Sequence, residues 1–244
     1  MSRVERCLLP DWPAPDRVFA ATTLRSGGVS QGCFGSLNMA LHVGDDPVQV
    51  LKNRQLISEM LALPSPPAWL NQVHGCAVVD AASVSGPVDA DAAFSHAPGI
   101  VCAVMTADCL PVLLCSRDGL SVAAVHAGWR GLLSGVITET VKAMNRSDLL
   151  VWLGPAIGPE AFEVGDEVRA AFVDKDPAYL KGFRRTDSGR WLADIYRLAR
   201  IDLASVGIEA VYGGHFCTVT DSERFFSFRR DGQTGRMATL IWRT

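Results

Sequence analysis

Three residues of types that bind transition metals stand in similar places in the sequence. His74 and His126 each follow a short run that ends in valine and precede a glycine-containing turn, and Cys109 follows the run VCAVMTAD. We expect all three at strand ends, where a rigid sheet holds a side chain that still reaches the adjoining loop. A His/Cys/His set with a fourth position left open is typical of catalytic zinc, whereas structural zinc normally has four protein ligands.

The spacing of these three residues is not diagnostic by itself. Histidines satisfied within the core or in loops, beside a buried thiol, are the alternative interpretation. The seven cysteines include no C-x₂₋₄-C pair, so a closed structural zinc site of the usual kind is not expected.

Asp108 interrupts an otherwise apolar run, residues 99–115, immediately before Cys109. An ionised carboxylate without partners is costly to bury, so Asp108 must reach a hydrogen-bond donor, a cation or water. The N–H group of a metal-bound histidine is one such partner, since carboxylates commonly orient these histidines. The predicted catalytic set is therefore Asp108 with His74, Cys109 and His126, in which Asp108 orients a ligand or transfers a proton.

The bulk composition argues against several classes of partner. The 244 residues have a formal net charge of -3 and a sequence pI near 5.9, which is not the basic character that nucleic acids and anionic membranes usually require. Charges at Arg3 and Glu5 and the early Pro10 do not fit a signal peptide. No apolar run reaches the roughly 20 residues of a membrane helix. We predict a cytoplasmic protein that binds neither nucleic acid nor membrane.

The cysteines indicate the cellular compartment, and the absence of repeats indicates the number of domains. An odd number of unpaired cysteines in mostly apolar contexts indicates a reducing compartment. No repeat, low-complexity tract or linker longer than the proline-rich segment 63–69 divides the chain. We predict a single domain over residues 1–244, with a monomer as the default.

Hydrophobic patterning predicts a mixture of strands and helices. Strand-like runs occur at 18–24, 76–81, 100–105, 112–115, 121–125, 149–153, 210–212, 225–228 and 238–242. Helices are predicted from Pro47 to about Leu61, after a cap at Asp46, and over 132–145, 165–173 and 192–206. Because helices and strands do not alternate regularly, we predict an α+β fold with mixed β-sheets flanked by helices rather than a doubly wound sheet.

Six stretches of the sequence together resemble one bacterial family. They are TLRSGGVSQGCFGSLNMALHVGDDP, NQVHG, TADCLPVLL, AVHAGWRG, WLGPAIGPEAFEVGDEV and FFSFRRDGQTGRMATLIW. In this order they resemble the YfiH-type proteins, also called polyphenol oxidase or laccase-domain proteins, from residue 18 to the C-terminus. The resemblance implies a YfiH-like α+β fold and a zinc site made by His74, Cys109 and His126.

The same resemblance implies several activities. These are phosphorolysis of adenosine, inosine and methylthioadenosine, deamination of adenosine, and, in enterobacterial members, hydrolysis of UDP-MurNAc-L-Ser in peptidoglycan editing. The older label implies copper-dependent oxidation of phenols. A multicopper oxidase needs on the order of ten histidines, and this chain has five, so only adventitious copper in the zinc site would support weak oxidation. Hydrolysis and deamination suit a three-ligand zinc, although the H-x-E and P-C-x-x-C signatures of zinc deaminases are missing.

Substrate-binding residues are predicted from the loops of these stretches. Arginines near glycine N–H groups suit phosphate, and Arg25 and Arg229 have the loop settings closest to the family motifs. Arg54, Arg130 and Arg230 are further cations for which a surface or ion-pairing role is favoured. Gln72 and Asn38 are predicted to bind polar groups of the substrate, with an exposed loop amide and a turn cap as the respective alternatives.

Two classes of function fit these residues. The first is a zinc-dependent enzyme acting on a small molecule, and the second is a non-enzymatic binding module with a vestigial metal site. The intact ligand set favours the enzyme. The sequence does not distinguish a nucleoside from a cell-wall precursor as substrate, nor does it identify the general acid or base.

Overall fold

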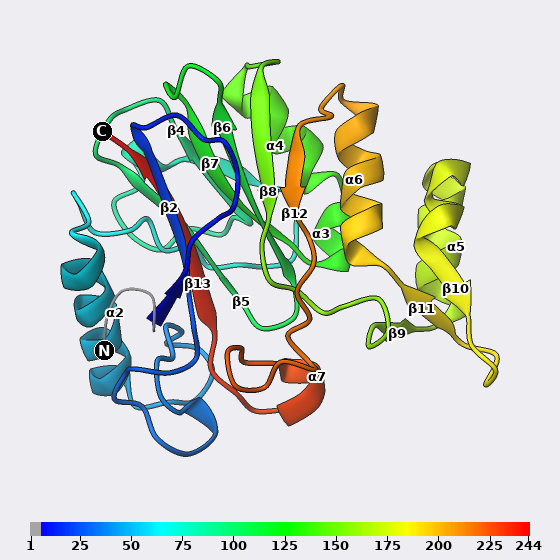
Figure 1. The fold of residues 1–244 in the computed structure, drawn as a ribbon, viewed down its shortest axis with the longest axis horizontal. Helices are drawn as coiled ribbons and strands as arrows, with labels where there is room; N and C mark the ends of the chain where they lie inside the picture. The colour runs from blue at the N-terminus through cyan, green and yellow to red at the C-terminus, as the bar shows by residue number, and fades with distance from the viewer. Residues whose placement is uncertain (1–5) are drawn as a thin grey trace.

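Two β-sheets packed face to face form the centre of the protein (Figure 1). The computed structural model describes residues 6–244. The smaller sheet has the order β1-β2-β13-β5, with strands Cys7–Leu8, Val18–Thr23, Met237–Arg243 and Val101–Thr106. The larger has the order β12-β8-β6-β7-β4-β3, with strands Val211–Gly213, Leu149–Leu153, Leu110–Ser116, Val122–Ala127, Ala92–Ser95 and Val78–Asp80.

Strand directions make the larger sheet mixed. β12 runs parallel to β8 and β3 runs parallel to β4, whereas the other pairs of this sheet are antiparallel. Every pair of the smaller sheet is antiparallel. The predicted α+β class with mixed sheets is therefore confirmed.

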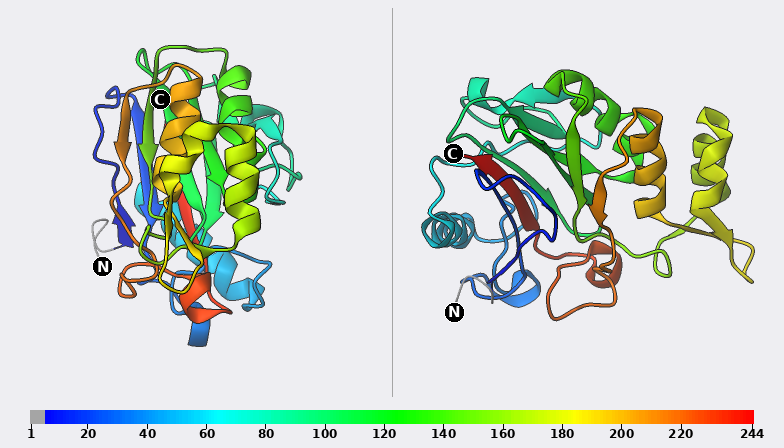
Figure 2. Two further views of the ribbon diagram at one scale, coloured as in Figure 1. Left: turned by 90° about the vertical axis from the view of Figure 1, so that its right-hand side faces the viewer. Right: turned by 45° about the horizontal axis from the view of Figure 1, so that its top comes forward.

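Apolar side chains fill the space between the sheets and beneath the helices. Val104 and Ile241 of the smaller sheet pack in one buried cluster with Leu113 and Trp152 of the larger sheet. Helix α2, Pro47–Leu61, covers the outer face of the smaller sheet through Ile57 and other apolar residues. Helices α3 (Trp129–Leu133), α4 (Val136–Met144) and α6 (Ile195–Ser205) cover the outer face of the larger sheet (Figure 2). The result is four layers, helix, sheet, sheet and helix.

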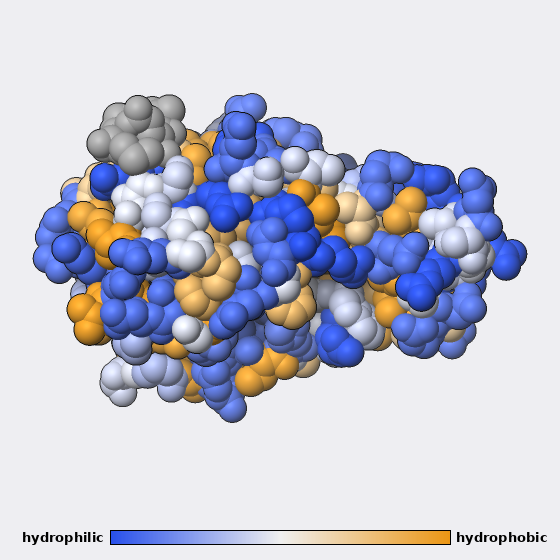
Figure 3. All heavy atoms as spheres, turned by 90° about the horizontal axis from the view of Figure 1, so that it is seen from below, coloured by the Kyte–Doolittle hydropathy of each residue, from blue (hydrophilic) through white to orange (hydrophobic). Residues whose placement is uncertain are grey.

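A third, small sheet belongs to a part that projects from these layers (Figures 1 and 2). It has the order β10-β11-β9, with strands Phe183–Arg185, Trp191–Ala193 and Glu163–Val164, next to helix α5, Asp166–Lys175, and the 3₁₀ helix η3, Pro177–Gly182. Two more 3₁₀ helices, Gly32–Phe34 and Ala81–Ser83, and the short helix α7, Phe228–Asp231, complete the elements. Seen from below, the surface of the projection is mostly hydrophilic, with small scattered apolar groups (Figure 3).

The predicted helix at Pro47 forms as expected. Asp46 accepts a hydrogen bond from the Val48 N–H at 2.9 Å, and Pro47 occupies the first position, where its missing N–H has no cost. Eight of the nine predicted strands lie within or overlap strands of the structure. The prediction for 225–228 is wrong, because Ser227 caps the short helix α7 and Phe225 and Phe226 are buried in the preceding loop.

Two predicted helices have different limits in the structure. The segment 132–145 divides into α3 and α4, because Gly135 has φ +89 and so leaves the helical conformation. The segment 192–206 begins its helix only at Ile195, because Asp194 caps the first turn by accepting from the Arg197 N–H at 3.0 Å. Its first residues belong to β11. Strands β1, β4, β9, β10 and β11 were not predicted as strands; four of them have only two or three residues.

Among residues 6–244, no helix combines the length and the apolar character needed to cross a membrane. Arg3 and Glu5, whose charges do not fit a signal peptide, lie outside the described residues. All seven cysteines lie inside them, and none of the seven forms a disulfide. The extent of a single domain over 1–244 stays a prediction.

Candidate active site

Cys109 lies in the turn that carries the chain from one sheet to the other. Residues 107–109 join β5 of the smaller sheet to β6 of the larger one. Asp108, at the centre of this turn, has φ +97, which L-residues other than glycine rarely adopt. Strained backbone of this kind is concentrated at functional sites. The turn thus presents the half-buried Cys109 thiol between the end of β5 and the start of β6.

The two histidines approach Cys109 from different elements. His126 belongs to β7, pairs in register with Pro111 of β6, and is 3% exposed. His74 is exposed in the loop before β3 and has φ +60. Its ring meets the ring of His126 edge-on, with centroids 4.8 Å apart. The predicted position near a strand end is therefore right for His126, while His74 is held in a loop.

The side-chain atoms of these three residues converge. One nitrogen from each histidine and the Cys109 sulfur all lie within 4.8 Å of one another, and Cys109 Sγ is 3.9 Å from His74 Nε2. This is the one group of three or more metal-binding side chains found among residues 6–244. Three soft or borderline donors at this separation match the three-ligand arrangement of an open metal site.

Asp91, which we did not predict from the sequence, organises two of these ligands. Its side chain is completely buried, and Oδ1 lies 2.7 Å from His126 Nδ1. It also accepts backbone N–H bonds from Val73 at 3.3 Å, His74 at 3.0 Å and Gly75 at 2.6 Å. A carboxylate on Nδ1 fixes the tautomer and leaves Nε2 of His126 as the donor to a metal.

Asp108 makes its side-chain hydrogen bonds to Thr218 and Arg229 rather than to a ligand histidine, and its part in proton transfer stays a prediction. Its Oδ1 accepts from the Thr218 hydroxyl at 2.5 Å, and its Oδ2 accepts from the Arg229 backbone N–H at 2.6 Å. The expected polar partners are therefore present, one of them a backbone N–H. The carboxylate that orients a ligand histidine is nevertheless Asp91, since Asp108 ties the turn to the segment around α7.

Electrostatics within the cluster favour a thiolate. Burial by itself would raise the pKa of Cys109, but the charge of His126 and hydrogen bonds from both histidines outweigh it and lower this pKa. Burial would likewise lower the pKa of His126, while the Cys109 thiolate and Asp91 raise it. Asp91 stays ionised, because hydrogen bonds from His126 and from the backbone offset the effect of burial and lower its pKa. The thiolate is the form that binds metal.

We expect Cys109 of the metal-free protein to react with iodoacetamide at unusually low pH. Only the thiolate is nucleophilic, so the alkylation rate rises as pH rises through the thiol pKa and then levels off. With the pKa lowered, the plateau is reached well below the ~8.5 of an ordinary cysteine. Peptide mass spectrometry after pulses between pH 5 and 9 measures the rate. A rate still rising through ~8.5 would contradict the electrostatic argument.

Gly128 gives the ligands the space that they occupy. A Cβ at this position would lie 3.1 Å from Cys109 Sγ and 3.1 Å from His74 Cδ2. We expect Gly128→Ala to shift both ligands and to weaken metal binding by roughly tenfold, the lower end of effects seen when ligand support is lost. Competition with a chelator measures the affinity. Gly86→Ala is the matched control because its Cβ would meet no atom within 4 Å; equal affinities of the two variants would refute the packing argument.

A family model described as "Multi-copper polyphenol oxidoreductase laccase" matches residues 19–244. The chain belongs to this laccase-domain, or YfiH, family. The resemblance seen in the sequence is confirmed.

Related proteins of the laccase-domain family are similar over nearly their whole length. A Pseudomonas aeruginosa protein named as a purine nucleoside phosphorylase is 55% identical over 238 residues, which cover 96% of this chain and 97% of that protein. The Escherichia coli protein named purine nucleoside phosphorylase YfiH is 51% identical over 245 residues, covering 98% and 99%.

Solved structures of laccase-domain proteins have the same fold. A Neisseria meningitidis protein matches with a TM-score of 0.95 and 50% identity, covering 98% of this chain and 99% of that one. YlmD from Geobacillus stearothermophilus matches with a TM-score of 0.91 and 30% identity, covering 100% and 98%. The YfiH-like fold expected from the resemblance is thereby confirmed.

Two cavities meet at the candidate metal site of this laccase-domain protein. One, of about 470 Å³, has apolar and aromatic walls that include Trp129, Phe162 and Phe228, and we call it the aromatic cavity. The other, of about 250 Å³, is lined by His42, Thr106, Arg236 and neighbouring residues, and we call it the basic cavity. The two cavities share four lining residues: His74, Ala107, Cys109 and Phe228. Ligands bound in both would therefore meet beside the cluster.

Two of the predicted substrate-binding residues are bonded within the fold away from both cavities. Asn38 is completely buried; its amide bonds Ala40 and Asp45 and accepts the Arg236 N–H at 2.9 Å. Arg25 donates to the Ser222 carbonyl and stacks over a buried ring. Neither residue lines the aromatic or the basic cavity. We therefore assign both to structural support.

The other two predicted residues do line the site. Gln72 lines the basic cavity, although its amide makes two hydrogen bonds to the Met105 backbone, donating at 2.8 Å and accepting at 2.7 Å. Arg229 lines the aromatic cavity and donates to the Glu163 carbonyl at 3.1 Å. Gln72 thus holds the His74 loop against β5, and of the four only Arg229 combines cavity lining with a charge.

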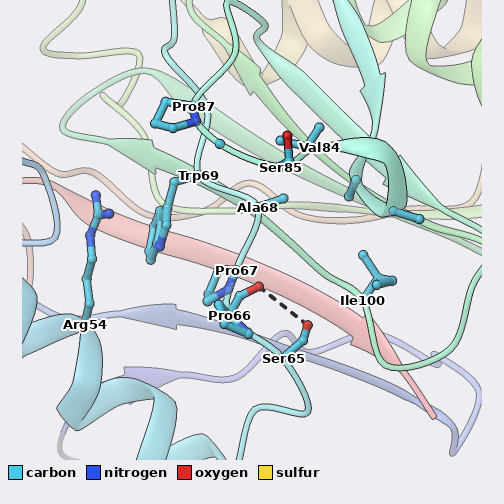
Figure 4. A pocket seen from close by; sticks show the side chains of 13 residues that line it. Arg54, Ser65, Pro66, Pro67, Ala68, Trp69, Val84, Ser85, Pro87 and Ile100 are labelled. Atoms are coloured by element: carbon cyan, nitrogen blue, oxygen red, sulfur yellow. Dashed lines mark hydrogen bonds between the residues drawn. The ribbon is translucent and has the colours of Figure 1, made fainter.

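The remaining candidate cations also differ in whether they line one of the two cavities. Arg130 lines the aromatic cavity, whereas Arg230 bonds backbone carbonyls and forms an ion pair with Asp231. Arg54 faces a separate cavity of about 410 Å³, where its guanidinium lies 3.9 Å from the centroid of Trp69 (Figure 4). Burial lowers the pKa of Arg54 to about 10. No metal-binding side chain lines that cavity, so Arg54 lies outside the candidate centre.

Sequence reasoning missed four residues of the site besides Asp91. They are Thr106, Trp129, Phe228 and Arg236. All four lie inside stretches that carry the family resemblance, but nothing in the sequence around them singles them out, and Phe228 was taken for a strand residue. Their shared feature, the lining of one of two adjoining cavities, exists only in the folded chain.

Proposed function

We propose that this laccase-domain protein is a zinc-dependent purine nucleoside phosphorylase. The observation that carries this proposal is the position of the His74/Cys109/His126 cluster, at the junction of an aromatic cavity and a basic one. The names of the Pseudomonas aeruginosa and Escherichia coli relatives support it. Adenosine, inosine and methylthioadenosine are the proposed nucleosides, in a cytoplasmic protein.

Zinc suits the donor set better than the copper of the family description. Imidazole and thiolate are common zinc ligands, and three of them leave one position for a substrate or water. When bound, zinc would supply Lewis-acid polarisation of a substrate oxygen. Copper also accepts two histidines and a cysteine, but multicopper chemistry needs further metal sites, and residues 6–244 contain one such cluster among a total of five histidines.

The chain's own residues then provide binding and orientation. Trp129 and Phe162 offer rings on which a purine can stack, and Glu163 and Glu167 offer carboxylates to ribose hydroxyls. Asp91 holds His126 and the His74 loop in place. Asp108 fixes the turn that carries Cys109 and also lines the aromatic cavity.

Deamination and amide hydrolysis at the same centre form the second candidate function. The open fourth position of a three-ligand cluster supports it, because water can be activated there. Adenosine deamination and hydrolysis of UDP-MurNAc-L-Ser, the peptidoglycan-editing reaction, both belong to this class. A non-enzymatic module with a vestigial site is disfavoured by the intact ligands and by their support from Asp91.

One comparison of substrates tests the proposal. The zinc-loaded protein is assayed with adenosine plus phosphate, with adenosine alone, and with UDP-MurNAc-L-Ser, and kcat/KM is compared. We expect adenine and ribose 1-phosphate as products, formed only when phosphate is present. Turnover of UDP-MurNAc-L-Ser alone would assign the site to hydrolysis, and turnover of none of these substrates by a fully zinc-loaded protein would contradict enzymatic function.

A further inference from the structure

We propose that the basic cavity is the binding site for inorganic phosphate, and that the nucleoside occupies the aromatic cavity on the other side of Cys109. This division rests on the proposed phosphorolysis and adds to it the placement of each substrate. Arg236, His42 and Thr106 line this cavity, and among the described residues none of the three forms an ion pair with a carboxylate.

Arg236 is held in place while part of its guanidinium stays without a partner. Its Nη1 donates to the carbonyls of Thr234 at 2.9 Å and Gly235 at 3.0 Å, and its backbone N–H is bonded to Asn38. Within residues 6–244 no carboxylate forms an ion pair with it, and Nε and Nη2 have no protein acceptor. A guanidinium fixed on one side and unsatisfied on the other is suited to an oxyanion that accepts two hydrogen bonds.

Thr106 and His42 add to this donor set. The Thr106 side chain is 1% exposed and lines the basic cavity, and its Oγ1 has no hydrogen-bond partner among the described residues. A buried hydroxyl without a partner is costly, so a bound acceptor would satisfy it. His42 also lines this cavity and adds a third donor. Its pKa is lowered, mainly by burial and also by the nearby charges of Arg236 and Arg54.

Charge and size distinguish the two cavities. The basic cavity includes Arg236 and no carboxylate in its lining, whereas the aromatic cavity includes three carboxylates, Asp108, Glu163 and Glu167, together with three arginines, Arg130, Arg190 and Arg229. Two of these arginines already have partners, because Arg190 forms an ion pair with Glu163 at 2.9 Å and Arg229 donates to the Glu163 carbonyl at 3.1 Å. The carboxylates of this cavity can accept hydrogen bonds from ribose hydroxyls. The basic cavity, about 250 Å³, is also smaller than the roughly 300 Å³ at which pockets for organic ligands begin.

The shared wall of the cavities brings the two substrates together. An oxygen of hydrogen phosphate forms a bond to ribose C1′ as the bond from C1′ to the purine nitrogen breaks, and the electron pair of that bond stays on the purine. In the net reaction the proton of hydrogen phosphate is transferred to the purine, so no other reactant is needed. Both partners lie beside His74 and Cys109, which line both cavities.

The test separates the two substrates in steady-state kinetics. In the zinc-loaded full chain, Arg236→Gln is expected to raise the KM for phosphate at least about tenfold, the effect of one lost charge-assisted hydrogen bond. The KM for adenosine should change less than twofold. Arg236→Lys should recover part of the loss, and Thr106→Val, a substitution of similar shape, should raise the phosphate KM in the same direction. Arg117→Gln, on an exposed loop between β6 and β7, is the matched control.

Other kinetic results would overturn the assignment of the basic cavity to phosphate. Equal changes in both KM values, or an unchanged phosphate KM in Arg236→Gln and Thr106→Val, would overturn the assignment. If Arg236→Gln weakens inhibition by adenosine 5′-monophosphate but not the binding of inorganic phosphate, the cavity takes the phosphate of a larger ligand, and the assignment is also overturned.

Failure of the proposed function can be recognised separately. Calorimetric titration of inorganic phosphate into the zinc-loaded protein, without nucleoside, measures the site directly. Binding by the wild type that is lost in Arg236→Gln would support a phosphate site even in a protein that performs no phosphorolysis. Equal binding by both proteins, or binding by neither, would refute it.

Discussion

Cys109→Ala is expected to reduce bound zinc from about one ion per chain to a small fraction and to lower kcat/KM by more than about 100-fold. Loss of a group that merely supports a ligand costs 10–100-fold in affinity or activity, so loss of a ligand should cost more. The thiolate is also the one anionic donor of the cluster. Metal analysis of the purified protein and an assay of adenosine with phosphate measure the two effects.

Two controls separate this effect from misfolding. Cys109 is half-buried in a turn, so removal of its sulfur leaves no large core cavity, and the thermal midpoint of the metal-free protein should change little. Cys33→Ala, at an exposed cysteine outside the cluster, should retain zinc and activity. Full activity in Cys109→Ala would refute metal-dependent catalysis at this site.

Asp91→Asn is expected to weaken zinc binding by about 10–100-fold, although the substitution hardly changes side-chain volume. An amide that donates its N–H to His126 Nδ1 would place the histidine proton on Nε2, which faces the cluster, and this tautomer cannot bind metal. An amide in the opposite orientation would leave the N–H groups of Gly75 and Val73 without an acceptor. Either arrangement should also destabilise the protein by about 1–3 kcal/mol.

Measurements on Asp91→Asn should combine affinity and stability. Chelator competition gives the zinc affinity, and thermal unfolding of the metal-free form gives the change in stability. Asp89→Asn is the matched control, because that carboxylate is exposed and bonds only the Asn71 amide. Wild-type zinc affinity in Asp91→Asn would show that the carboxylate does not support the ligands.

The metal ligands could be found from the sequence, but their support could not. His74, Cys109 and His126 are rare residue types in contexts that the family resemblance also marks. Asp91 sits in the unremarkable run VDADA, and only the pairing of β4 with β7 brings it beside His126. Asp108 was expected in that role because it is adjacent to Cys109 in the chain. Adjacency in sequence does not determine the direction of a side chain in a tight turn.

The same limit applies to the substrate residues. Arg25 and Asn38 lie in a stretch typical of the family, yet their side chains hold loops together. Arg236, 198 positions after Asn38, is instead the cation of the basic cavity, with its backbone N–H bonded to the Asn38 amide. Contacts between segments this far apart in the sequence depend on the packing of β13 into the smaller sheet. The monomeric state and the physiological substrate stay predictions.

X-ray absorption at the zinc edge of the purified wild-type protein tests the central claim most directly. We predict one sulfur ligand at about 2.3 Å and two imidazole nitrogens at about 2.0–2.1 Å, with the remaining position filled by a light atom. The sulfur contribution should vanish in any zinc retained by Cys109→Ala. A protein without zinc, or zinc without a sulfur ligand, would contradict the assignment of His74, Cys109 and His126 as the metal site.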